Sequence, residues 1–220
     1  MLFFVENIAR FSVLVPVIFY LFIKSKDKSL QVLFYFLLFI LIHQIIFNSL
    51  ANRESPYTNA FNAFYTPIEF LFTALYIRAN IKSLSFRRFI FVSLVIYFIC
   101  WAPFLLLGKT QDYFSYIRGI TYTLIISHCL LFFYEQMRYP QSLFIYTQRP
   151  FWGIVGFLLF AAGTFFIFLF DQFSNNVNGF LEQYVFIHAI LFTIRNLFFA
   201  VTFFIKPEKI PLADMSPSIT

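Results

Sequence analysis

Residues 30–50 read LQVLFYFLLFILIHQIIFNSL and contain no Asp, Glu, Lys or Arg. A helix of about 20 mostly apolar residues is long enough to cross the hydrocarbon core of a bilayer. The apolar residues follow one another without alternation, which favours a helix over a barrel strand. A helix also satisfies its own backbone hydrogen bonds, as lipid requires. This stretch therefore predicts a transmembrane helix.

The whole chain has the composition of a membrane protein. Of its 220 residues, 60% are hydrophobic, 12% are charged and 37 are Phe, and the mean hydropathy is +0.78. Soluble domains contain about 45–50% apolar and about 25% charged residues. A soluble fold of this size would expose one large apolar patch, so a soluble domain is excluded.

Seven apolar runs are long enough to span a bilayer. We therefore predict an all-α, polytopic membrane bundle of seven transmembrane helices, forming one domain over residues 1–205. Residues 206–220 contain three prolines, and we expect them to be a short, disordered cytoplasmic tail. Pro16, Pro67 and Pro103 lie within runs and are expected to kink their helices. The predicted spans are 2–23, 30–50, 60–77, 89–107, 117–134, 151–170 and 180–205.

The basic residues outside these runs predict the orientation. Eleven Lys and Arg residues lie in the odd-numbered loops and the tail, and two lie on the opposite side. The positive-inside rule then places the N-terminus outside and the C-terminus in the cytoplasm. This distribution also accounts for the net charge of +6 without a nucleic-acid partner. We expect a multi-pass protein of the bacterial inner membrane, with the bilayer itself as its surroundings.

Polar residues within the third run form one stripe. Asn62, Tyr65 and Glu69 are spaced three and four residues apart, so they share a helix face. A charge at mid-bilayer costs about 2.5–3.5 kcal/mol even on the lenient insertion scale. Glu69 is the deepest carboxylate, and we expect it to be either neutral or paired with an arginine.

The last run carries a second polar stripe. Tyr184, His188 and Arg195 follow i, i+4 and i+11, and Asn196 is adjacent. Arg195 lies about 15 Å inside the span at about 1.5 Å per residue, too deep for snorkelling. A buried arginine at this depth is the strongest indication of a functional interior.

Other polar residues also lie between the outer end and mid-depth of their spans. Glu6 and Arg10 are four residues apart, so they share a helix face and are expected to form an ion pair. The pair either belongs to the polar interior or lies at the surface near the outer interface. Together the polar groups predict a pocket that is open to the outside and sealed below. With one excess positive charge, it favours an anionic small molecule or lipid. The remaining predicted pocket residues are His43, Arg118 and His128.

The sequence gives no support for a bound cofactor. Residues 180–205 contain no lysine for a retinal Schiff base. The three histidines in the spans have no i, i+4 spacing, and no Cys or Asp accompanies them at depth, so a zinc site is a weak alternative. Haem remains an open but unsupported alternative. Cys100 and Cys129 lie in apolar runs, which argues against a disulfide framework.

Several short motifs resemble an uncharacterised family of small seven-span bacterial inner-membrane proteins. They cover most of the chain, and Arg195 beside Asn196 departs from the family pattern. No activity is assigned to the family, so the resemblance implies the seven-span count and little more. The matching residues are Pro16 with Tyr20, Tyr65 with Glu69, Arg118, Phe151 with Trp152, Gly163, and His188 with Asn196.

Three functions fit this sequence. A sensor or accessory subunit in signalling, which passes a signal to a protein partner or complex, is favoured because no soluble domain is present. A small-molecule or proton-coupled transporter is an alternative, since Glu69, His188 and Arg195 are suited to coupling. An intramembrane lipid-modifying enzyme with His and Glu as acid and base is a further alternative, although a non-enzymatic role is favoured.

Overall fold

The fold is known from a computed structural model. It describes residues 2–23, 27–51, 58–106, 110–140, 144–173 and 180–205, with side chains at several helix ends left out: those of 2–3, 58–60, 62–63, 104–106, 110–116, 168–173 and 180–182. The predicted tail, 206–220, lies outside the described residues. Within these ranges the elements are all helical. They are α1 (Leu2–Ser12), α2 (Leu14–Phe22), α3 (Lys28–Ala51), α4 (Thr58–Asn80), α5 (Leu84–Leu106), α6 (Thr110–Arg138), a short 3-10 turn (Ile145–Thr147), α7 (Arg149–Phe173) and α8 (Phe180–Phe204).

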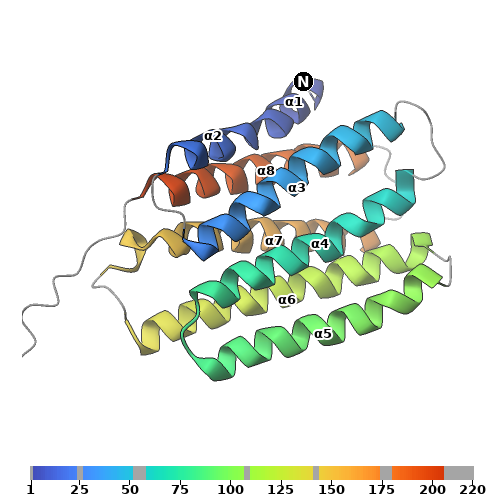
Figure 1. Cartoon of the computed structure of the whole chain (residues 1–220). Coiled ribbons are helices and arrows are strands. Elements are labelled where there is room, and N and C mark those ends of the chain that lie inside the picture. The colour runs from blue at the N-terminus through green and yellow to red at the C-terminus, as the bar shows by residue number, and fades with distance from the viewer. Residues whose placement is uncertain are drawn as a thin grey trace, which may run out of the picture.

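The long helices lie side by side in a bundle (Figure 1). Helix α8 packs against α1, α2 and α7, while α4 packs against α3, α5 and α6. Helix α5 lies at the edge, where it contacts α4 and α6. Its apolar side chains remain exposed, as expected for a face turned to lipid, and they include Phe89, Val92, Ile96 and Ile99.

The bundle has two distinct ends. At the α3–α4 end, α3 and α7 finish and α4 and α8 begin; at the α4–α5 end, α4 and α6 finish and α5 and α7 begin. Basic residues near the α4–α5 end include Arg78, Lys82, Arg87 and Arg88.

Pro16 breaks the first apolar run into α1 and α2, with the break at Val13. Proline has no N–H to offer the carbonyl one turn earlier, so the hydrogen-bond ladder is interrupted there. The expected kink is thus a division into two helices. Ser12 lies at the break, and Pro67 and Pro103 lie inside helices that continue past them.

Among the residues described, six helical segments, rather than the expected seven, are long and apolar enough to cross a membrane, with α1 and α2 counted together as Phe4–Phe22. Helix α4 is not among them, and its described side chains are those of Phe61 and residues 64–80. Its 23 residues give about 35 Å at about 1.5 Å each, which is sufficient length. Its polar side chains Thr66, Glu69 and Thr73 are buried among the neighbouring helices.

The apolar core lies between α3, α4, α7 and α8. Phe157 is at its centre, with its ring centroid 5.6 Å from that of Phe36, 4.8 Å from Phe199 and 5.8 Å from Tyr76. All four side chains are buried. This aromatic cluster fills the interior between mid-depth and the α4–α5 end.

Helices α7 and α8 approach closely at glycine. A Cβ on Gly156 would lie 3.0 Å from the Cβ of Phe198 and 3.3 Å from the carbonyl oxygen of Arg195. A Cβ on Gly163 would also collide with Leu191. Small residues permit such packing between membrane helices. The two glycines therefore fix the position of α8, and with it that of Arg195.

Candidate functional site

The buried centre of the bundle is an ion pair between Glu69 on α4 and Arg195 on α8. Their side chains are 1% and 0% exposed. Arg195 Nη1 donates a hydrogen bond to Glu69 Oε1. Of the two expected states of Glu69, neutral or paired with an arginine, the structure shows the pair. The pair joins α4 to α8, and its two residues are 126 positions apart in the chain.

Two tyrosine hydroxyls complete the surroundings of the Glu69 carboxylate. Tyr65, one turn earlier on α4, donates to Oε1 at 3.5 Å, and Tyr122 of α6 donates to Oε2 at 3.4 Å. Arg195 Nη2 in turn donates to the Tyr65 hydroxyl at 3.3 Å. Burying two charges is costly unless their remaining hydrogen-bonding positions are also used. The two hydroxyls serve that purpose for the Glu69 carboxylate, whereas the buried Arg195 Nε has no hydrogen-bond partner among the described residues.

Aromatic rings enclose the Arg195 guanidinium. Its central carbon lies 4.0 Å from the ring centroid of Phe160 and 4.7 Å from that of Phe192. Phe36 and Phe199 follow at 5.4 and 5.8 Å. Ring faces attract a cation at such distances, most strongly where water is excluded. The pair and its rings therefore form a closed layer at mid-depth.

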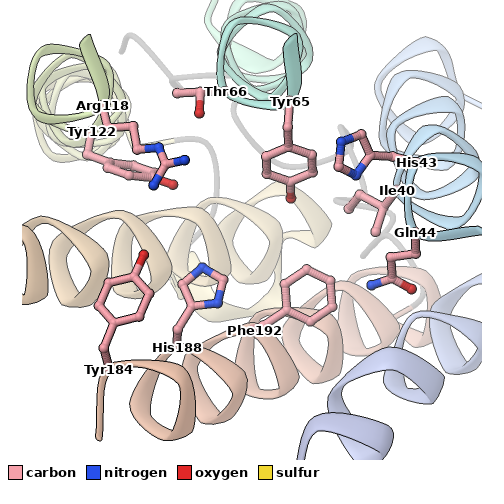
Figure 2. Close-up of a pocket in the computed structure, with 10 residues that line it drawn as sticks. All are labelled: Ile40, His43, Gln44, Tyr65, Thr66, Arg118, Tyr122, Tyr184, His188 and Phe192. Atoms are coloured by element: carbon pink, nitrogen blue, oxygen red, sulfur yellow. The ribbon is translucent and has the colours of Figure 1, made fainter. Parts of the chain in front are cut away.

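A cavity of about 220 Å³ lies above this layer, between the layer and the α3–α4 end. Figure 2 shows its lining side chains, which come from α3, α4, α6 and α8. Tyr65 and Tyr122 belong both to this lining and to the surroundings of Glu69. The lining residues are Ile40, His43, Gln44, Tyr65, Thr66, Arg118, Tyr122, Tyr184, His188 and Phe192.

Two histidines face this cavity from different helices. His43 is 8% exposed, and its ring stacks on that of Phe61 with the two centroids 4.8 Å apart. The ring also hydrogen-bonds the Phe61 backbone, while its Nε2 has no hydrogen-bond partner among the described residues. His188 lies against Phe160 at 5.3 Å and is stacked with Tyr184 at 6.0 Å. The rings are thus held in place by aromatic neighbours.

A second cavity, of about 180 Å³, adjoins the first. The two share Gln44, His188 and Phe192 as lining residues. Glu6 and Arg10 line the second cavity, where their side chains lie 3.8 Å apart and remain partly exposed. The expected pair on α1 is therefore an exposed ion pair next to the main cavity.

Two predicted pocket residues, His128 and Asn196, lie elsewhere, and a third falls outside the described side chains. His128 is buried between α5 and α6, with Nε2 2.9 Å from Ser93 Oγ and its ring 5.6 Å from that of Phe70. Asn196 points to the other side of α8, where it donates to Ser12 Oγ at 2.7 Å. Asn62 is in α4, but its side chain is outside the described residues. Among the described residues, no three His, Cys, Asp or Glu side chains are grouped so that they could hold a metal ion.

Sequence reasoning did not identify Ile40, Thr66 or Phe192 as lining residues, nor the rings around Arg195. Phe occurs 37 times, so no pattern marks the few rings that contact a guanidinium. Thr66 is adjacent to Tyr65, outside the i, i+4 stripe that Tyr65 shares with Glu69. Comparison with protein-family models, curated proteins and solved structures finds no match for this chain.

Proposed function

We propose that the chain is a seven-span protein of the bacterial inner membrane, with α4 as the seventh span. The length of α4 and its position among the six apolar helices support this count. The basic residues favour the α4–α5 end as the cytoplasmic one, which makes the α3–α4 end the outer one. On this orientation, the main cavity faces outward.

With this topology and orientation, the chain acts as a sensor or accessory subunit that binds a small ligand in the main cavity. The observation that carries this proposal is the cavity with a closed floor. The floor consists of the Glu69–Arg195 pair, and Tyr65 and Tyr122 belong both to the floor and to the cavity wall. A ligand that moves either tyrosine changes the hydrogen bonds of the pair, which joins α4 to α8.

The floor favours binding over transport. Below Arg195, the core is filled by the rings of Phe157, Phe199 and Tyr76. The hydroxyls of the buried Thr73 and Thr202 donate to carbonyls one turn earlier in their own helices. A substrate that crossed the membrane would have to separate these rings. Binding in the outer half needs only small shifts of four helices, and a signal is then passed to a membrane partner.

The test combines binding, uptake and partner identification. The purified protein is reconstituted in vesicles, and saturable ligand binding and accumulation of the same labelled ligand are measured. We expect binding without accumulation, loss of binding in Thr66→Trp, which fills the cavity, and retention in Thr147→Trp at the other end. Cross-linking in the native membrane is expected to give one membrane partner in fixed ratio.

Two results would contradict the proposal. Accumulation that Thr66→Trp abolishes would favour the transporter, and its dependence on a proton gradient would then define the coupling. The absence of both a ligand in the cavity and a fixed partner would leave no basis for a sensor or an accessory subunit.

A further inference from the structure

An arginine of α4 lies on the surface of the edge helix α5. The central carbon of the Arg78 guanidinium is 5.3 Å from the ring centroid of Phe91. Phe91 is exposed, and α5 is the helix at the edge of the bundle (Figure 1). Arg78 is half-buried, and its buried Nε has no hydrogen-bond partner among the described residues. Its guanidinium therefore extends from α4 onto the outer, apolar surface of α5.

Two further arginines lie on the same face of α5. Arg87 and Arg88 precede Phe91 by four and three residues, so they lie one turn nearer to the start of the helix, with Cβ atoms about 5–6 Å away. Long side chains in a helix lean toward its N-terminus, so the Phe91 ring leans toward this turn. Arg78, Arg87 and Arg88 together are called the arginine cluster.

The arginine cluster has no counter-charge among the described residues, where no ion pair involves any of its three members. Two carboxylates lie at the same end of the bundle and are engaged elsewhere. Glu135 accepts from backbone N–H groups at the start of α5, and Asp27 pairs with Arg149. The segments 24–26 and 141–143 contain no Asp or Glu. Like charges held close together repel one another, so an anion bound between them lowers the free energy.

An apolar track continues from the arginine cluster along α5. Phe91, Val95 and Ile99 follow one another at a spacing of four residues, and all three are exposed. The eight residues from Phe91 to Ile99 extend about 12 Å at about 1.5 Å each. This covers most of one leaflet of a hydrocarbon core that is about 30 Å thick. Cations at one end of such a track match the phosphate of a lipid, and the track matches its acyl chain.

We propose that this surface binds one anionic phospholipid. Its phosphate lies at the arginine cluster, and one acyl chain lies along Phe91, Val95 and Ile99. Planar guanidinium groups bind phosphate oxygens through paired N–H groups. A zwitterionic lipid is disfavoured because its headgroup brings a further cation to the cluster. The site is at the α4–α5 end, whereas the main cavity lies toward the α3–α4 end, so the inference is independent of the proposed function.

The test measures lipid binding by the full chain. Delipidated protein in neutral detergent is titrated with phosphatidylglycerol or phosphatidylcholine, and bound lipids are counted by native mass spectrometry. We expect one phosphatidylglycerol to bind about tenfold or more tightly than phosphatidylcholine. Arg78→Gln and Arg87→Gln should each weaken phosphatidylglycerol by about fivefold and leave phosphatidylcholine unchanged. Equal binding of the two lipids to the wild type would overturn the proposal.

Arg138→Gln is the matched control. Arg138 is exposed at the same end of the bundle, and its guanidinium carbon lies 5.5 Å from the ring centroid of Tyr139, but it belongs to α6. The variant removes the same charge from the same end, and it should leave phosphatidylglycerol binding unchanged. Equal weakening by Arg138→Gln and Arg78→Gln would show a general attraction to the basic surface and would overturn a defined site.

A substitute is available for the main variant. Should Arg78→Gln fail to fold, Arg78→Lys serves instead and should weaken phosphatidylglycerol by a smaller factor, because it retains the charge without the planar fork. Phe91→Ala removes the ring beneath the guanidinium and should also weaken the lipid. Unchanged binding in both of these variants would overturn the proposal.

Competition identifies the occupant. Inorganic phosphate in large excess should not displace phosphatidylglycerol, and displacement would assign the cluster to a free anion. Neutralising Glu208 and Asp214 in the tail should leave lipid binding unchanged, whereas tighter binding would assign the cluster to the tail. Thr66→Trp should also leave it unchanged, and loss of the lipid there would place it in the main cavity. Each of these opposite results would overturn the proposal without bearing on the floor of the main cavity.

Discussion

Replacing Glu69 by Gln should destabilise the bundle more than any other single change at this site. The variant leaves the Arg195 guanidinium fully buried without its counter-charge, and a guanidinium cannot become neutral by losing a proton. Removal of one partner from a buried pair costs about 3–5 kcal/mol. Arg195→Met should cost less, about 2–3 kcal/mol, because the remaining carboxyl can become neutral by taking up a proton.

The double variant Glu69→Gln with Arg195→Met gives the sharper result. It removes both charges and places an apolar side chain among the four rings that surround Arg195. Replacement of a buried ion pair by uncharged groups often changes the free energy of unfolding little. We expect the double variant to lie within about 1–2 kcal/mol of the wild type, far from the sum of the single effects.

The assay is the free energy of unfolding in bicelles, measured for all four members of the cycle. Glu6→Gln and Arg10→Met form a matched control cycle, because that pair is four residues apart on one helix and partly exposed. Its coupling should not exceed about 1 kcal/mol. Additive single effects at Glu69 and Arg195, or single variants as stable as the wild type, would refute the reasoning.

Three further changes test the packing of the helices. In the same unfolding assay, Gly156→Val should cost about 1–3 kcal/mol, because even a Cβ there comes within 3.0 Å of an α8 side chain. The control Gly119→Ala should be neutral or stabilising, because no atom lies within 4 Å of the added Cβ. Glu135→Gln should cost about 0.5–2 kcal/mol and speed amide exchange at the start of α5, because the carboxylate accepts from two backbone N–H groups there at 2.6–3.2 Å. Asn196→Leu should cost about 0.6–2 kcal/mol through loss of its hydrogen bond to Ser12, and a further Ser12→Ala should add little; full additivity of these two would contradict the contact.

The sequence predicts the helical class and most helix positions because lipid imposes a strong condition on continuous stretches of chain. The break at Pro16 follows from a missing N–H, which is also a local property. Helix α4 (Thr58–Asn80) contains the predicted run 60–77, so its position also follows from the sequence, although it is not among the six spans found in the described residues.

The site could be predicted only within single helices. Tyr65 and Glu69 share a face because they are four residues apart, and the structure keeps both at the centre. The pairing of Glu69 with Arg195 depends on how α4 and α8 are placed, which no local pattern specifies. For the same reason, His128 has the same sequence signal as His43 but bonds Ser93 rather than lining the cavity.

The most direct test of an outward cavity with a closed floor is thiol accessibility along α8. His188→Cys and Thr202→Cys are made in a background that carries Cys100→Ser and Cys129→Ala. His188 lines the cavity, whereas Thr202 is 0% exposed and lies beyond Arg195 toward the α4–α5 end. A membrane-impermeant maleimide applied to intact cells should label His188→Cys and leave Thr202→Cys unlabelled, also in inverted membranes. Labelling of His188→Cys only in inverted membranes, or of Thr202→Cys from the same side as His188→Cys, would contradict the account.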